Sequence, residues 1–282
     1  MKLFIIIFLL LLSILIFCYN NKFSNNDLTF IYFYTDNIYD YAQHSLLNIK
    51  KYTQKYNYKL KIFNKVYDHE YKPCWNKIKA ILDTMESVNK NSFIVWIDAD
   101  ALINNFNINI LDFTKSHDDK DLFICYDCVK DRECLNSGVM IIRNTDWSYN
   151  LFNKTWLSKQ EHGYNDQNVL LDEIIKERYE EYKDGYYNPN KSRFKNYCVD
   201  NIHPKVKIFE ENAFNTHIEN ANYNDFIIHL MGFNTNMRID IMRQINTKNN
   251  LDNYNKNICI ELLKNKSDES RTQKLKYNKC TK

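Results

Sequence analysis

The sequence predicts an α/β fold built around a mostly parallel sheet, and two features of the chain point to it. Short apolar runs rich in β-branched and aromatic residues alternate with longer segments of helical pattern. The run Phe93-Ile-Val-Trp-Ile97 is apolar throughout, which is typical of a strand buried on both faces. At 282 residues the chain is long enough for one large domain with a sizeable core.

The expected elements follow one another in the order strand, helix, strand. A first strand is expected at residues 28–34, a helix at 39–56 and a second strand at 58–63, an order that predicts parallel pairing. Residues 177–201 are charged and rich in tyrosine and are expected to form a mobile excursion. The remaining expected strands are 93–97, 122–125, 135–144, 206–209 and 225–232, with helices at 75–88, 147–157 and 166–175.

The N-terminal segment predicts a membrane anchor. Residues 3–19 are apolar except for Ser13, and at about 1.5 Å per residue they approach the length of a membrane span. No small-residue cleavage site follows, which favours an uncleaved signal anchor over a cleaved signal peptide. Lys2 favours a cytosolic N-terminus, so we expect a single-pass type II membrane protein.

The anchor divides the chain into expected parts. Residues 1–19 are the signal-anchor transmembrane segment, 20–27 a short stem, 28–246 the globular domain, and 247–282 a polar tail or peripheral helix. The globular domain would then lie in the lumen of the secretory pathway. A short span suits a thin membrane such as the Golgi, or a host membrane if the gene is viral.

Charge and cysteine content narrow the classes of function. The formal net charge of +3 gives no electrostatic footprint for nucleic acid. Of the 8 cysteines, Cys18 lies in the anchor, so an odd number remains and at least one is free or intermolecular if the others pair. The Cys125, Cys128 and Cys134 group has no second pair at zinc spacing, which favours a disulfide or free thiols. A lumenal domain would offer glycosylation sequons at Asn153, Asn190 and Asn265.

Two aspartates follow the buried strand at 93–97. In an extended segment, side chains at i and i+2 point the same way, so Asp98 and Asp100 would meet at the carboxyl edge of the sheet. Two hard oxygen donors there suit Mg²⁺ or Mn²⁺ carrying a diphosphate. The simpler alternative is that Asp98 begins a turn and Asp100 caps the next element.

Other polar residues sit where elements begin or end, and each has a structural alternative. Lys77 could reach a phosphate or a base, or be a solvated helix lysine. Gly138 marks close approach by a ligand or another backbone, or a bulge. His229 ends a strand, where a hydrogen-bonded structural role competes with metal ligation. Asp166 suits a helix N-cap, from which Gln167 would project.

Several motifs in one order resemble the retaining glycosyltransferases of the GT-A type, in particular glycosyltransferase family 34, with similarity to the glycogenin-like enzymes of family 8. The resemblance spans residues 75–238 by motif and begins near residue 28 by strand order. It implies a GT-A, Rossmann-like nucleotide-diphospho-sugar transferase fold. The motifs are Trp75-Asn-Lys77, Trp96-Ile-Asp98-Ala-Asp100, Leu135-Asn136-Ser137-Gly138 with Arg143-Asn144 and Trp147, Asp166-Gln167, and His229-Leu-Met-Gly232.

The resemblance also implies an activity: retaining transfer of a hexose or pentose from a nucleotide sugar such as UDP-Gal, UDP-Xyl, UDP-Glc or GDP-Man to a glycan or glycoprotein. The implied metal is Mn²⁺, or Mg²⁺, although an imidazole ligand favours Mn²⁺. The sequence leaves the oligomeric state open. The alternatives are a non-catalytic sugar- or nucleotide-binding protein of the same fold and a metal-dependent phosphoesterase.

Residue roles follow from the same resemblance. Asp100 and His229 would ligate the metal, and Asp98 would contact the metal or the ribose. Asp166 and Gln167 would flank the transferred sugar, with the Gln167 amide near the anomeric carbon. The implied contacts to the donor come from Lys77 and Arg238 at its phosphates, from Asn136 at its sugar hydroxyls, and from Gly138 and Gly232 where the backbone approaches it.

Overall fold

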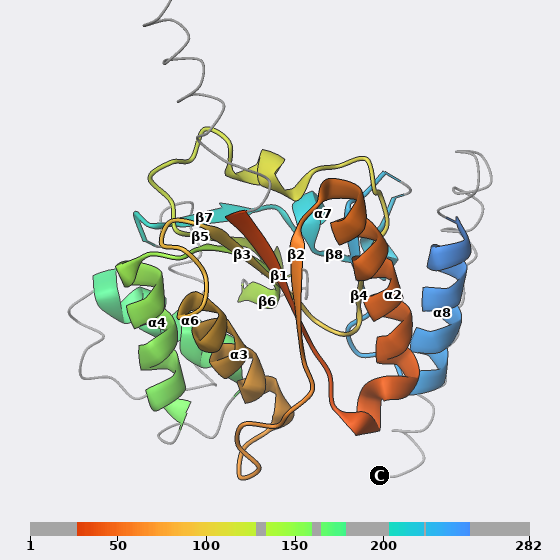
Figure 1. Cartoon of the computed structure of the whole chain (residues 1–282), viewed down its shortest axis with the longest axis horizontal. Helices are drawn as coiled ribbons and strands as arrows, with labels where there is room; N and C mark the ends of the chain where they lie inside the picture. The colour runs from red at the N-terminus through yellow and green to blue at the C-terminus, as the bar shows by residue number, and fades with distance from the viewer. Residues whose placement is uncertain (1–26, 128–133, 160–164, 179–202, 223, 249–282) are drawn as a thin grey trace, which may run out of the picture.

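The computed structural model describes residues 27–127, 134–159, 165–178, 203–222 and 224–248 (Figure 1). The predicted anchor and nearly all of the stem, the excursion and the C-terminal tail lie outside the described residues, as do the sequons at Asn190 and Asn265 and the side chains of Cys128 and Cys134. No helix within the described ranges is long and apolar enough to cross a membrane.

A six-stranded sheet forms the centre of the molecule, in the order β2-β1-β3-β6-β5-β7. β1 pairs in parallel with both β2 and β3, and β5 pairs in parallel with β7. β6 pairs antiparallel with β3 and β5, so it is the reversed strand of this sheet. The prediction of a mostly parallel sheet is confirmed. The strands are β1 (Leu28–Phe33), β2 (Lys59–Phe63), β3 (Phe93–Ile97), β5 (Leu122–Asp127), β6 (Cys134–Arg143) and β7 (Val206–Phe209).

A second, three-stranded sheet was not predicted. Its strands are β4 (Ala101–Ile103), β9 (Ile227–His229) and β8 (Thr216–His217), with β4 antiparallel and β8 parallel to β9. The strand expected at 225–232 is present only as the three residues of β9. Strands of two or three residues carry too little local pattern to be read from sequence, because they exist only through their partners.

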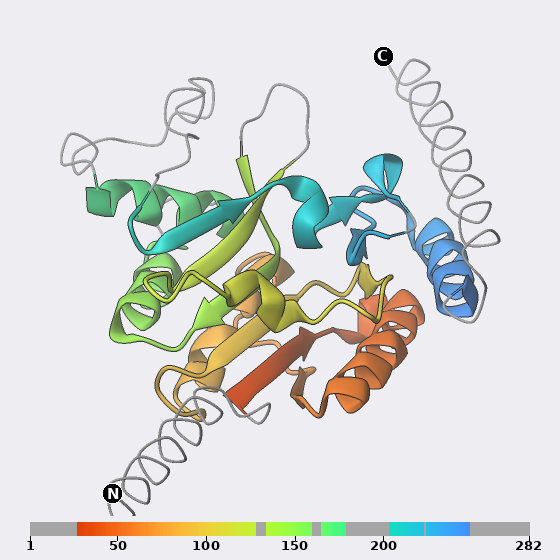
Figure 2. The ribbon, with the colours of Figure 1, turned by 90° about the horizontal axis from the view of Figure 1, so that it is seen from above.

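Helices cover both faces of the large sheet. α3 (Asn76–Met85), α4 (Asp146–Leu157) and α6 (Asp166–Arg178) lie on one side, whereas α2 (Tyr39–Tyr56) and α8 (Thr235–Lys248) pack together on the other (Figures 1 and 2). α2 ends at the left-handed Asn57, and α4 begins with a capping box at Thr145. α8 and the short α7 (Glu211–Phe214) were not predicted.

The core is divided by the sheet into two apolar layers. Along β1, Phe30 and Tyr32 face the layer that contains α2 and α8, while Ile31 and Phe33 face the layer that contains α3 and α4. Burying each such side chain contributes about 1.5–3 kcal/mol. Because β1 is buried on both faces, it reads as a continuous apolar run, as a central parallel strand should.

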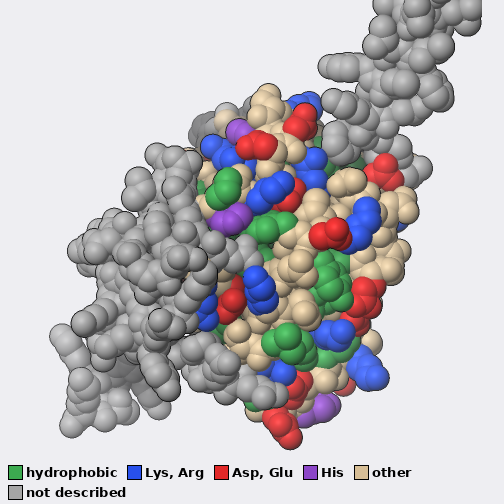
Figure 3. Space-filling model, turned by 90° about the vertical axis from the view of Figure 1, so that its left-hand side faces the viewer, with side chains coloured by type: hydrophobic (Ala, Val, Ile, Leu, Met, Phe, Trp, Pro, Cys, Tyr) green, Lys and Arg blue, Asp and Glu red, His purple; other side chains and the backbone are tan. Residues whose placement is uncertain are grey.

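The surface agrees with the nearly balanced net charge. On the face shown in Figure 3, Lys and Arg side chains are interspersed with Asp and Glu.

The chain leaves the large sheet after Ile97 and enters the small one at Ala101. Asp98 and Asp100 therefore lie where the two sheets join.

Candidate active site

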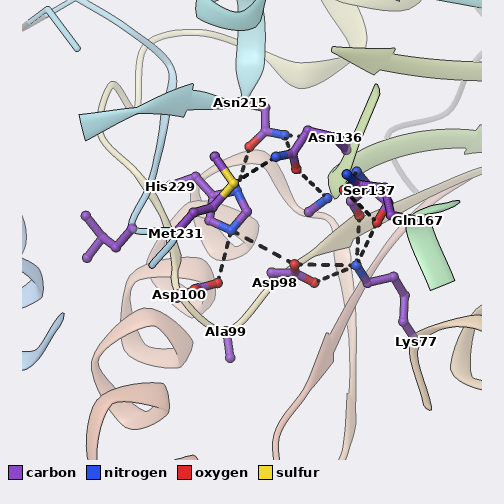
Figure 4. Close-up of polar contacts among 12 residues, drawn as sticks. Lys77, Asp98, Ala99, Asp100, Asn136, Ser137, Gln167, Asn215, His229 and Met231 are labelled. Carbon is purple, nitrogen blue, oxygen red and sulfur yellow. Dashed lines mark hydrogen bonds and ion pairs between the residues drawn. The ribbon is translucent and has the colours of Figure 1, made fainter. Parts of the chain in front are cut away.

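The two aspartates occupy a turn between the sheets. The backbone N–H of Asp98 donates to the carbonyl of Gly138 (2.8 Å), and the N–H of Ala101 donates to the carbonyl of Asp98 (3.0 Å). The turn that we gave as the simpler alternative is thus present. It still brings the Asp98 and Asp100 carboxylates to one site, where both approach His229 (Figure 4).

Asp98, Asp100 and His229 form a group that fits a metal ion. One ligand atom of each lies within 4.8 Å of the others. Nε2 of His229 is 3.1 Å from Oδ1 of Asp100 and 4.0 Å from Oδ2 of Asp98. An ion with ligands at about 2.1 Å places neighbouring ligand atoms about 3 Å apart and opposite ones about 4.2 Å apart. Two carboxylates and an imidazole at these distances suit a divalent cation.

The three groups titrate differently. Burial raises the pKa of Asp98, although Lys77 and His229 oppose the shift. Burial of Asp100 is outweighed by His229 and Arg238, which hold the pKa of its carboxyl below its ordinary value. Burial would lower the pKa of His229, but Asp100 raises it. The negative charge of Asp98 is therefore less well compensated than that of Asp100. An added cation would stabilise the ionised form of Asp98 most.

Lys77 is buried on α3 beneath the site. Its Nζ lies 3.1 Å from Oδ1 of Asp98 and 3.2 Å from Oδ2 of Asp166. It also donates to the carbonyl and the hydroxyl of Ser137, both at 3.1 Å. The two carboxylates raise the pKa of Lys77 despite its burial. Lys77 is thus no solvated helix lysine, and its ammonium ties together three segments of the site.

Arg238 reaches the opposite side of the site from α8. Its Nη2 donates to Oδ2 of Asp100 (2.7 Å), and its guanidinium stacks on the ring of Tyr41, 4.9 Å from the centroid. With Lys77, it sets two cations against the three carboxylates of Asp98, Asp100 and Asp166. One negative charge remains when His229 is neutral, which favours binding of a cation.

Gly138 lies in a bulge of β6, and an aromatic ring covers it. The pairing of β5 with β6 passes from Ile124–Met140 to Cys125–Asn136, so residues 137–139 have no partner in β5. A Cβ at position 138 would stand 2.2 Å from Cε1 of His229. The bulge offered as the alternative is present, and the group that approaches this glycine is the side chain of His229, not another backbone.

Asp166 and Gln167 begin α6 and face Ser137 on β6. The backbone N–H of Ser137 donates to Oε1 of Gln167 (3.0 Å), and its hydroxyl donates to Oδ2 of Asp166 (3.1 Å). Asp166 is 3% exposed. Its carboxylate is therefore engaged by Ser137 and Lys77, and Gln167 has its oxygen fixed by a backbone donor.

Three site residues were missed by the sequence analysis. Asn215, after α7, contacts His229 and Asn136, and Met231 accepts a hydrogen bond from Asn136 (2.8 Å). Asp127 ends β5; burial raises its pKa while hydrogen bonds from Asn136 and Gln167 oppose the shift. The rule that singled out Asp98, a polar residue at a strand end, would have found Asp127 had the predicted strand not ended at 125. Asn215 carries no comparable signal.

Gly232 is the predicted site residue that the structure leaves outside this network. It adopts φ 79°, a left-handed conformation that favours glycine, and a Cβ there would meet nothing within 4 Å. The turn after β9 accounts for this glycine. The structure brings together the other nine predicted residues, Lys77, Asp98, Asp100, Asn136, Gly138, Asp166, Gln167, His229 and Arg238.

Comparison with known proteins agrees with this site. The sequence profile of the galactosyl transferase GMA12/MNN10 family matches residues 14–127, which include both aspartates of the turn. No curated protein sequence matches the chain.

Solved structures of glycosyltransferases are similar to this chain, and the first of them supports the shared fold. A glycosyltransferase involved in the glycosylation of the major capsid of PBCV-1 aligns with a TM-score of 0.53 at 12% identity, covering 76% of this chain and 98% of that one. An active-site mutant of LgtC aligns with a TM-score of 0.47 at 10% identity, covering 78% and 95%. The apo form of the glycosyltransferase GlyE from Streptococcus pneumoniae aligns with a TM-score of 0.47 at 11% identity, covering 85% and 63%.

Proposed function

We propose that this chain, which has the GT-A fold and is similar to the galactosyl transferase GMA12/MNN10 family over residues 14–127, is a glycosyltransferase. It would transfer a hexose or pentose from a nucleoside-diphosphate sugar to a glycan or glycoprotein, with retention and with Mn²⁺ or Mg²⁺. The convergence of Asp98, Asp100 and His229 carries this proposal. UDP-Gal, UDP-Xyl, UDP-Glc and GDP-Man are the donors to test.

The metal half of the site has the chemistry that a nucleotide sugar needs. Asp98, Asp100 and His229 would hold a divalent cation, whose chemistry there would be to offset the charge that develops on the leaving nucleotide diphosphate. The chain's own part is to orient its ligands. Trp96 donates from Nε1 to Oδ1 of Asp98 (2.7 Å), which fixes one carboxylate before any ion binds.

The sugar half of the site favours positioning over nucleophilic attack. Asp166 is buried and engaged by Lys77 and Ser137, so it suits a group that holds the site in shape. This arrangement supports a reaction on one face of the sugar, in which the acceptor hydroxyl attacks as the nucleotide leaves and a β-phosphate oxygen takes its proton. Positioning and electrostatic stabilisation then supply the rate.

Membrane attachment is part of the same proposal. Residues 3–19 would anchor the chain as a type II protein with the catalytic domain in the lumen, most suitably of the Golgi. Protease treatment of sealed membranes that contain the full chain tests it: the domain should be protected until detergent is added.

The activity is tested by release of the nucleotide from candidate donors. The full chain is incubated with UDP- and GDP-sugars in Mn²⁺ or in EDTA, since transfer to water needs no known acceptor. We expect one donor to release its nucleotide in Mn²⁺ but not in EDTA, and the Asp100→Asn variant to lose this release. The matched control is Asp146→Asn, whose carboxylate is 91% exposed and remote from the site.

The outcomes separate the alternatives. Donor binding without release, across a broad panel of acceptors, would support a binding protein and contradict the proposal. Cleavage of simple phosphate esters without sugar transfer would support a phosphoesterase. Full activity in a folded Asp100→Asn variant would exclude the assigned metal site.

A further inference from the structure

His229 is held on both ring nitrogens, and only one of them faces the metal site. Nε2 faces Asp100, whereas Nδ1 lies 3.0 Å from Oδ1 of Asn215. An imidazole binds a metal through the nitrogen that carries no proton. Nε2 faces the carboxylate of Asp100, so the ring can bind a metal there only if Nδ1 keeps the proton when Nε2 gives its own up. Whether Nδ1 keeps it depends on what Asn215 presents, its amide oxygen or its amide nitrogen.

The direction of the amides can be worked out from the backbone. The backbone N–H of Gly138 donates to the side chain of Asn136 at 2.8 Å, and a backbone N–H can only donate. The atom of Asn136 that it meets is therefore Oδ1. The other end, Nδ2, then faces the sulfur of Met231 at 2.8 Å, which is an acceptor.

The same reasoning fixes the next amide. One end of the Asn215 side chain lies 2.9 Å from Oδ1 of Asn136 and 3.5 Å from its backbone carbonyl. Both of these atoms accept, so this end is Nδ2. Oδ1 of Asn215 is left facing Nδ1 of His229, and since an amide oxygen has no proton to give, Nδ1 must carry one.

The side chains that form these hydrogen bonds are shielded from solvent. Asn215 is 1% exposed, and Asn136 and His229 are 3% exposed. Gly138 provides both the first donor and the space, because a Cβ there would lie 2.2 Å from Cε1 of His229 and 2.9 Å from Oδ1 of Asn136. A buried polar group without a partner is costly, so the four residues hold one arrangement.

We propose that Gly138, Asn136 and Asn215 form a hydrogen-bonded relay that fixes the Nδ1–H form of His229 and turns its Nε2 lone pair toward Asp98 and Asp100. Asn215 is then a positioning residue of the metal site. The inference about the ring stands on the relay alone, whereas its consequence for metal binding rests on the proposed function. Partners of this kind are typically worth about 10–100-fold in metal affinity.

Mn²⁺ binding to the full chain, measured by electron paramagnetic resonance without any sugar donor, tests the consequence. Asn215→Leu removes the acceptor while keeping the number and branching of the side-chain heavy atoms, and should weaken binding by about 10–100-fold. Asn215→Asp keeps an oxygen for Nδ1–H and should retain more of the affinity than Asn215→Leu. The control is Asn144→Leu, another buried asparagine, which bonds three backbone carbonyls at the far end of β6 and should leave the affinity unchanged.

Nitrogen NMR of the His229 ring, in the metal-free full chain at alkaline pH, tests the relay itself. The proton should reside on Nδ1 in the native chain and redistribute in Asn215→Leu. A proton on Nε2 with a bare Nδ1 would overturn the inference, and so would equal Mn²⁺ affinity in the native chain and a folded Asn215→Leu variant. A protonated Nδ1 in a chain that binds no ion would instead contradict the proposed function and leave the relay standing.

Discussion

The two cations of the site are held in different ways on its two sides. Lys77 is 6% exposed and is shared between Asp98 and Asp166, in the angle between the large sheet and the helices α3 and α6. Arg238 is 19% exposed and, among the described carboxylates, pairs only with Asp100, from the helix α8 that packs on α2. On the first side, one buried ammonium is shared between two carboxylates. On the second side, one guanidinium forms a single ion pair near the surface.

This difference separates an ion pair that the fold needs from one that a metal ion can replace. Removing Lys77 would leave the buried carboxylate of Asp166 and the partly exposed carboxylate of Asp98 without this counter-ion, whereas Asp100 would keep His229 if Arg238 were lost. A metal ion held by Asp98, Asp100 and His229 must share Asp98 with Lys77 and Asp100 with Arg238. The Lys77 cluster therefore gives the site its shape, and the pair of Asp100 with Arg238 is the one that an ion can replace with less disturbance.

Lys77→Met should have the largest effect. It leaves the buried carboxylate of Asp166 without its counter-ion, and breaking a buried ion pair from one side costs about 3–5 kcal/mol. Urea unfolding in EDTA measures the loss. The exposed pair of Lys90 with Asp146 supplies the control, because Lys90→Met should change the free energy of unfolding by less than about 0.5 kcal/mol. Similar losses in the two variants would remove the contrast on which this comparison depends.

The two glycines that were predicted as site residues should respond differently to replacement by alanine, in stability and in Mn²⁺ binding. Gly138→Ala drives a Cβ into the buried ring of His229 and should cost about 1–3 kcal/mol and weaken Mn²⁺ binding. Gly232→Ala has open space but a φ of 79°, so it should cost about 1 kcal/mol and leave Mn²⁺ binding intact. Unfolding and Mn²⁺ titration of both variants measure this. A normal Mn²⁺ affinity in Gly138→Ala would show that the ring has room that the contact distances deny.

The large sheet could be predicted because its strands identify themselves locally. β1 and β3 are apolar runs long enough to exclude other readings, and the helix α2 after β1 has clear apolar spacing. The small sheet could not, since β4 and β8 are set by their pairing with β9. α8 was also missed: Ile241, Met242 and Ile245 are buried, but they stand among polar residues at the end of the expected globular domain, where no helix was predicted.

The site divides in the same way. Asp98 and Asp100 follow a strong strand, and the resemblance to known glycosyltransferases linked them to His229 across the chain. Asn215 is one asparagine among many in the sequence, and nothing local marks it. Its role comes from a hydrogen-bond network that spans three separate segments, which only the fold assembles.

Arg238→Gln should reduce stability less than Gly138→Ala does. Asp100 is partly exposed and keeps His229, so the loss of stability in EDTA should be about 1 kcal/mol. Mn²⁺ should raise the melting temperature of this variant more than that of the native chain, because the ion no longer competes with the guanidinium for Asp100. An equal or smaller rise would mean that Arg238 does not hold the carboxylate against the ion.

His229 should give the metal-free protein a pH dependence of definite sign. Burial opposes the charge on the ring, but Asp100 raises the pKa of His229 above its ordinary value of 6.5. A group whose pKa is higher in the folded state stabilises the fold fully below the unfolded-state value, and this contribution is lost as the pH rises through the folded-state pKa. The free energy of unfolding in EDTA should therefore fall over that range.

The comparison variant for this measurement is His229→Gln, which should lack the fall. His44 makes the difference between variants necessary, because burial and Arg243 lower its pKa and its contribution runs the opposite way. Asp100→Asn should move the fall to lower pH, since the group that raises the pKa of His229 is then neutral. If the native chain and His229→Gln lose stability in parallel, the charge on the ring is not coupled to Asp100, and the Asp100 side of the site is looser than its distances imply.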